Sequence, residues 1–187
     1  MNKLPSLLAI IICTAIILFP TPSNSYSTGS PGGKTGSIID GQNCASCHAN
    51  SGLATGASIT TNIPATGYVP GNTYTITTNI NQAGINKFGF ELTAEENSGA
   101  NKTGTFFITN NTETQLTNNA TAVTHKAGGT SGSNNKSWSM DWEAPSAGTG
   151  DITFFGAYIA ANGNGSNNGD TYHASSLTFN ESIGIPG

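Results

Sequence analysis

Short runs in which apolar and polar residues alternate dominate the chain after residue 56. Turns rich in Gly, Asn and Pro separate these runs, which are 57–63, 74–80, 88–94, 104–108, 121–125, 138–143, 152–158 and 172–179. A period of two is that of a half-buried strand, and no convincing period of 3.6 follows residue 50. The pattern predicts an all-β domain of about eight short strands, typical of a β-sandwich.

The low charge of the chain agrees with this prediction. Only 9% of the 187 residues are charged and none is Arg, so Asn, Thr, Ser and Gly must form the polar surface. These residues suit turns better than helices. The net charge is -4 and the six Lys are scattered, which argues against a nucleic acid partner because a phosphate backbone needs clustered positive charge.

The first 25 residues have the pattern of a signal peptide. A positive start at Lys3 precedes an apolar run over 4–19, and small residues end at Ser25, where we expect cleavage. The alternative is a retained anchor, but the run is short for a membrane span. We therefore predict an exported protein of the periplasm, cell surface or medium, with no stable membrane span after cleavage. The mature chain would have a Gly/Ser-rich lead-in over 26–56 and a sandwich domain over 57–187.

Cys44-Ala45-Ser46-Cys47-His48 contains the only two Cys that remain after cleavage. C-x-x-C-H is the signature of c-type haem attachment. The two thiols add to the vinyl groups of one haem, and His48 supplies the proximal iron ligand. The alternatives are a redox dithiol, which leaves His48 unexplained, and a zinc site formed by these three residues with a distant His.

The distal iron ligand has three candidates in the mature chain. His125 ends a short strand beside a flexible turn, where it can meet a cofactor docked on the end of the sandwich, so we favour it. His173 begins the last strand and is the alternative. Met140 lies between Trp138 and Trp142 and is better explained as a core residue.

The spacing of the motif restricts where a haem can lie. About twenty residues separate the expected cleavage site from Cys44, and the β pattern follows soon after His48. A separate helical cytochrome domain does not fit there, so the haem must pack against the sandwich or be widely exposed. We expect Asp40 to cap a short helical turn at the motif. Loop 162–170 has the oxygen density of a Ca²⁺ loop, but its single carboxylate favours a plain hairpin.

Several motifs resemble those of bacterial "choice-of-anchor V" proteins, which are similar to the Reeler (reelin N-terminal-like) domain. The matching segments run in order through most of the mature chain: 30–36, 68–74, 88–94, 124–125, 138–145 and 150–157. The resemblance implies an immunoglobulin-like β-sandwich and an envelope or secreted location, with possible cell-surface association. It also favours His125 over His173, because the family pattern has a His at that place.

The motif and the expected export favour a monohaem electron-transfer protein with an unidentified redox partner protein. No Ser-His-Asp order, carboxylate pair or phosphate loop stands out, so we expect no enzyme activity. Two alternatives stay open. The haem could be structural in a cell-surface binding or adhesion module, or it could be the sensing group of a small-ligand sensor with an open sixth position.

Overall fold

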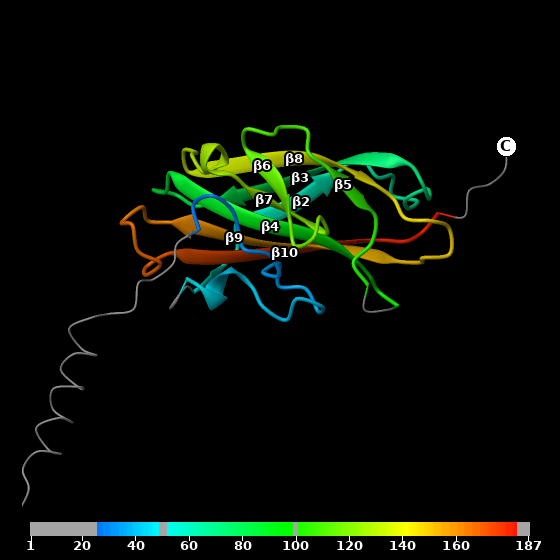
Figure 1. Ribbon diagram of the computed structural model, residues 1–187, viewed down its shortest axis with the longest axis horizontal. Coiled ribbons are helices and arrows are strands. Elements are labelled where there is room, and N and C mark those ends of the chain that lie inside the picture. Colours follow the sequence, from blue (N-terminus) through cyan, green and yellow to red (C-terminus); the bar gives the residue numbers. More distant parts are fainter. Residues whose placement is uncertain (1–25, 49–51, 99–100, 183–187) are drawn as a thin grey trace, which may run out of the picture.

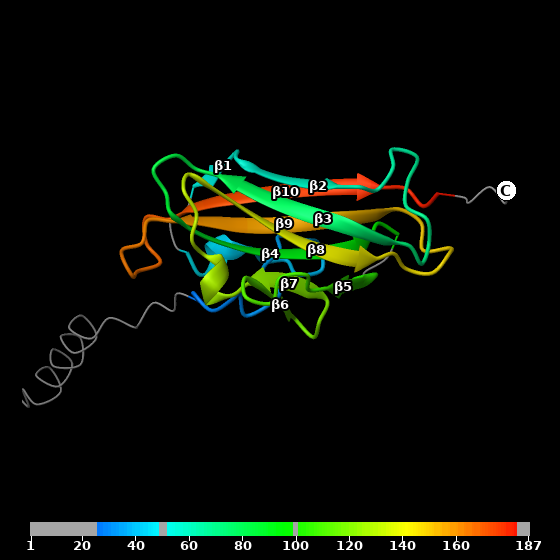
Figure 2. The same cartoon turned by 90° about the horizontal axis from the view of Figure 1, so that it is seen from above.

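The computed structural model describes residues 26–48, 52–98 and 101–182, so the predicted signal peptide lies outside the described residues. Two β-sheets pack face to face, as Figures 1 and 2 show. The six-stranded sheet has the order β1 (Leu53–Ala54), β10 (Thr171–Phe179), β9 (Ile152–Ala161), β4 (Lys87–Glu96), β7 (Ala122–His125) and β6 (Thr114–Thr117). The four-stranded sheet has the order β2 (Ala57–Thr61), β3 (Thr73–Asn81), β8 (Asn135–Glu143) and β5 (Thr105–Phe107). The predicted all-β sandwich is confirmed.

Alternating side chains from the two inner faces form the core. Large apolar residues that are almost fully buried include Ile76, Phe90, Trp138, Trp142 and Phe154. The rings of Phe90 and Trp138 stack across the two sheets with their centroids 4.4 Å apart. Burial of each such side chain contributes on the order of 1.5–3 kcal/mol, so the period of two in the sequence is the main source of the fold.

Two strands were missed in the sequence. β1 has only two residues and pairs in parallel with the start of β10, so its sequence has no room for an alternation. It also places a strand inside the segment expected to be a lead-in. β6 pairs with β7 at the sheet edge and is rich in polar residues. Edge pairing through the backbone does not require an apolar pattern, which explains why both escaped prediction.

The segment 26–43, here called the lead-in strap, lies on the outer face of the six-stranded sheet. In Figure 1 this blue segment lies on the side of β9 and β10 that faces away from the other sheet. Ser30 holds it there: its backbone N–H donates to Thr124 Oγ1 at 2.9 Å, and its hydroxyl donates to the Glu91 carboxylate. Gln115 Nε2 donates to the Thr28 carbonyl at 2.6 Å. The strap is thus part of the sandwich and not a free leader.

No helix within the described residues is long and apolar enough to cross a membrane.

Candidate functional site

A cavity of about 270 Å³ lies at one end of the sandwich, under the lead-in strap. Its walls come from the strap, the Cys44–His48 turn, the first residues of β4, the end of β9, and loop 162–170 between β9 and β10. Cys44, Cys47, His48 and His125 all line it, although His125 is 77 positions beyond His48. Phe88, Phe90, Ile159 and Ala161 supply apolar walls. The structure therefore brings the C-x-x-C-H motif and the favoured distal His into one cavity.

A single turn of 3-10 helix, η1 (Cys44–Ser46), shapes the motif. Asn43 caps it, since its side chain accepts from the backbone N–H of Ala45 at 2.9 Å. The prediction that Asp40 would be the cap is wrong. Asp40 instead accepts from Thr35 Oγ1 at 2.5 Å and pairs with Lys102 at 2.6 Å, which stabilises the strap. An Asn one residue before the turn has the shorter reach that capping needs.

Cys44 and Cys47 carry free thiols that line the cavity. Burial raises the pKa of Cys44, and the nearby Glu91 and Cys47 raise it further. A thiol with a raised pKa stays protonated and is a poor attacking thiolate or zinc ligand. Within the described residues, no group of three or more His, Cys, Asp or Glu is arranged to hold a metal ion.

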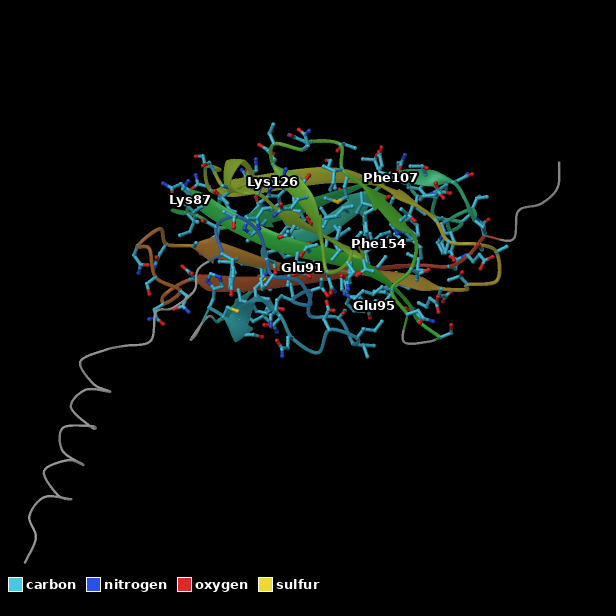
Figure 3. The ribbon with its side chains drawn as sticks, in the orientation of Figure 1. Lys87, Glu91, Glu95, Phe107, Lys126 and Phe154 are labelled. Carbon is cyan, nitrogen blue, oxygen red and sulfur yellow. The ribbon has the colours of Figure 1, made fainter. Side chains whose placement is uncertain are left out.

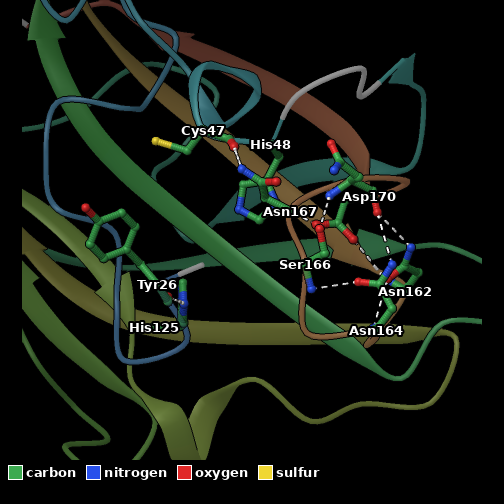
Figure 4. Close-up of polar contacts among 10 residues, drawn as sticks. Tyr26, Cys47, His48, His125, Asn162, Asn164, Ser166, Asn167 and Asp170 are labelled. Carbon is green, nitrogen blue, oxygen red and sulfur yellow. Dashed lines mark hydrogen bonds and ion pairs between the residues drawn. The ribbon is translucent and has the colours of Figure 1, made fainter. Parts of the chain in front are cut away.

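His48 forms a hydrogen bond with a buried carboxylate from loop 162–170. Its Nδ1 lies 2.6 Å from Asp170 Oδ2, and the exposed fractions of the two side chains are 17% and 1%. The other carboxylate oxygen, Oδ1, accepts from the backbone N–H of Asn162 at 2.9 Å. Figure 4 shows the His48 side chain beside Cys47 and the residues of this loop. With Nδ1 held by Asp170, Nε2 is the ring nitrogen that would ligate an iron.

Loop 162–170 uses its polar side chains to fold upon itself and to grip the motif. Asn162 Oδ1 accepts from the backbone N–H of Asn164 at 3.0 Å, and Asn164 Oδ1 accepts from that of Ser166 at 2.8 Å. Asn167 Nδ2 donates to the Cys47 carbonyl. These two side-chain oxygens accept hydrogen bonds within the loop itself.

His125 is 7% exposed and is fixed by backbone groups. Its Nδ1 accepts from the Phe90 N–H at 3.1 Å, and its Nε2 lies 3.2 Å from the Tyr26 carbonyl, to which it donates. Burial lowers the pKa of His125, and the charge of His48 lowers it further while the backbone contacts raise it. The ring is therefore neutral at pH 7, the state in which imidazole binds a metal.

The other two distal candidates lie elsewhere. Met140 is fully buried in the core strand β8, as expected for a core residue. His173 is also fully buried and does not line the cavity; it lies beside Gly56, where an added Cβ would be 3.1 Å from its Cε1. Within the described residues, neither ring nitrogen of His173 has a hydrogen-bond partner. The structure thus groups His125, and not Met140 or His173, with the motif.

Charge is distributed unevenly along the sandwich. Lys34 and Lys87 line the cavity, and Lys126 follows His125 in the chain. Figure 3 labels Lys87 and Lys126. These three lysines bind neutral oxygens, of Gln42, Ser131 and Asn111 respectively. At the opposite end, acidic residues gather round Tyr68, whose pKa rises to about 12 because of burial and of Glu181, Asp151 and Glu96. The cavity therefore opens at the more positive end of an acidic protein.

Sequence reasoning missed two residues of the site. Asp170 was considered only as a Ca²⁺ ligand, although a lone carboxylate in a loop rich in Asn and Gly is itself a sign of a site residue. Gly89 lies under the His125 ring, where a Cβ would be 2.8 Å from Cε1. A Gly inside a predicted strand indicates such a close approach.

Comparisons with known proteins give a clear family. The family model of the Reeler domain matches residues 43–163, which is more than half of the chain. A crystal structure of the Reelin-N domain of F-spondin is 22% identical, with a TM-score of 0.54, and the match covers 72% of this chain and 94% of that one. The human F-spondin reeler domain (fragment 1) is also 22% identical, with a TM-score of 0.51 and coverage of 70% and 94%. None of the curated proteins compared with the chain matches it. The chain belongs to the Reeler domain family.

Proposed function

We propose that the protein is an exported monohaem c-type cytochrome that transfers electrons through a haem held in the cavity under the lead-in strap. One observation carries the proposal: Cys44, Cys47 and His48 line the same cavity as His125, a buried imidazole from a distant strand. We also propose that the protein is of the choice-of-anchor V type and that it is located in the periplasm, at the cell surface or in the medium. The Reeler family, whose domains are typically extracellular, supports export.

The residues of the cavity fit a covalent haem. Two free thiols two residues apart can form the thioether links, and Ile159 and Ala161, which pack in one cluster with Cys44, offer apolar contacts to a macrocycle. Lys34 and Lys87 supply cations for its carboxylates. When bound, such a group supplies one-electron chemistry between ferric and ferrous iron. A cavity of about 270 Å³ does not enclose a whole macrocycle, so one edge would face solvent, where electrons can pass to a partner.

Each imidazole has its own part. His48 would offer Nε2 to the iron while its Nδ1 stays with Asp170, which it contacts at 2.6 Å. His125 would offer Nε2 as well, in place of its bond to the Tyr26 carbonyl. The Nδ1 proton would then be donated to the Phe90 carbonyl, 3.3 Å away, and the Phe90 N–H would give up its bond to Nδ1. Two imidazole ligands favour low-spin iron and little structural change on reduction, which suits electron transfer.

The main alternative, a haem that only fastens the N-terminal segment in an adhesion module, has less support. Ser30, Gln115 and Thr117 already hold the strap to the sheet through hydrogen bonds. A sensor would require an open sixth position, whereas His125 lies in the cavity. The electron-transfer function therefore uses more of the site than either alternative.

Expression of the full chain with a c-type haem attachment system tests the proposal. We expect a band that stains for haem after denaturing electrophoresis, and a spectrum that is reversibly reduced. The Cys44→Ala/Cys47→Ala variant should lose the stain because the thioether links are lost. Ser46→Ala is the matched control, since it alters the spacer of the motif and should keep the stain. A stain that survives the double change, or its absence from the wild type, would overturn the proposal.

A further inference from the structure

We propose that Asp170 is a positioning residue for His48 that lowers the reduction potential of the iron. This inference rests on the proposed function and deepens it, because it assigns a role to loop 162–170. The observation behind it is the 2.6 Å contact between His48 Nδ1 and Asp170 Oδ2, in which the Asp170 side chain is only 1% exposed.

The carboxylate is held in one orientation. Asp170 is the last residue of loop 162–170 and immediately precedes β10, and its Oδ1 accepts from the backbone N–H of Asn162 at the start of the same loop. Asn162 Nδ2 donates to the Asn168 carbonyl at 3.0 Å, which closes the loop at its base. With Oδ1 bound to the backbone, Oδ2 is directed at His48. A surface ion pair lacks this second anchor and this burial.

The loop also holds the motif at a second point. Asn167 Nδ2 donates to the Cys47 carbonyl, next to His48 in the chain. Gly165 and Ser166 of the loop line the cavity beside His48. The loop thus fixes both the backbone of the motif and the ring of its His. Since a His ring turns about its Cα–Cβ and Cβ–Cγ bonds, anchoring Nδ1 determines where Nε2 points.

A carboxylate partner also changes what the imidazole supplies. A His that donates its Nδ1 proton to a carboxylate is a more basic ligand than one that donates to a neutral carbonyl. A more basic ligand stabilises ferric iron more than ferrous iron, because ferric iron bears the additional positive charge. The buried negative charge of Asp170 acts in the same direction. Both effects lower the reduction potential.

The test compares the potentials of haem-loaded variants by spectroelectrochemical titration. Asp170→Asn keeps the size of the side chain and removes its charge. We expect it to reduce the preference of the site for ferric iron about tenfold, which is an upward shift of about 59 mV for one electron. Asp141→Asn is the matched control: it makes the same change on the outer face of the four-stranded sheet, where Asp141 accepts from the Thr75 hydroxyl. The control should keep the wild-type potential.

The outcomes separate this inference from the proposed function. If Asp170→Asn loads haem but has the potential of Asp141→Asn, the inference fails and the cytochrome proposal stands, even if the variant is less stable. A wild type without covalent haem overturns both. If Asp170→Asn does not bind haem, Asp170→Glu is used in its place, because the additional methylene displaces the carboxylate relative to His48. We expect a raised potential there as well, and an unchanged one would overturn the inference.

Discussion

Gly89 of β4 lies beneath the ring of His125, and a Cβ added to Gly89 would be 2.8 Å from Cε1 and 3.2 Å from Nδ1. The ring can accept from the Phe90 N–H only because this space is free. A strand glycine thus positions the candidate distal ligand, although it is not itself a ligand.

We therefore expect Gly89→Ala to displace the His125 ring and to lower the free energy of unfolding by about 1–3 kcal/mol, the usual cost of overpacking. In haem-loaded protein it should also weaken the low-spin signal. Chemical denaturation and electron paramagnetic resonance measure the two effects. Gly52→Ala is the control because an added Cβ there meets nothing within 4 Å. Equal behaviour of the two variants would show that Gly89 has no such role.

His173 predicts a dependence of stability on pH. Burial lowers the pKa of His173, so the unfolded chain, with a pKa of about 6.5, binds protons more readily than the folded one. As far as His173 is concerned, the free energy of unfolding has its full value above pH 6.5 and decreases as the pH falls below 6.5. His173→Leu should remove part of this loss and leave stability at pH 7 unchanged or higher, since two buried unpaired nitrogens are removed. Denaturant unfolding of both proteins between pH 8 and pH 5 tests this; parallel curves would contradict it.

The lysines around the cavity predict the charge preference of its redox reactions. The haem-loaded protein should react faster with ferricyanide than with hexaammineruthenium at low ionic strength, and salt should reduce the difference. Lys87→Gln/Lys126→Gln should slow only the reaction with ferricyanide. The Glu96→Gln/Asp151→Asn variant at the opposite end is the control. Stopped-flow rates at several salt concentrations give the answer, and an identical salt dependence for both reagents would argue against this account.

The strands that pack the core were predictable, and the edges were not. Alternation over 74–80 or 138–143 identifies a face because burial of residues such as Ile76 and Trp142 dominates the energy. β1 and β6 form through backbone pairing at the sheet edges, which leaves little trace in side-chain pattern. The order of strands in the sheets likewise depends on contacts between distant segments.

The site shows the same division. Cys44, Cys47 and His48 are adjacent in the sequence, so their motif could be read directly. His125 was favoured from its place at a strand end and from the family resemblance, and the structure brings it to the cavity. Asp170 could not be assigned, because its pairing with His48 joins residues 122 positions apart. Asn43 replaced Asp40 as the cap because local geometry, and not charge, decides which side chain reaches the turn.

Electron paramagnetic resonance of the exported, haem-loaded protein is the most direct test of the central claim that His48 and His125 serve one iron. We predict a low-spin ferric signal in the wild type and in His173→Ala. His125→Ala should give a high-spin ferric signal, and its iron should bind carbon monoxide once it is reduced. Among the residues that the structure describes, the partners of the His125 ring nitrogens are backbone groups and the neighbouring Thr124 hydroxyl, so the fold should persist. A low-spin signal that survives in His125→Ala, or that is lost only in His173→Ala, would contradict the account.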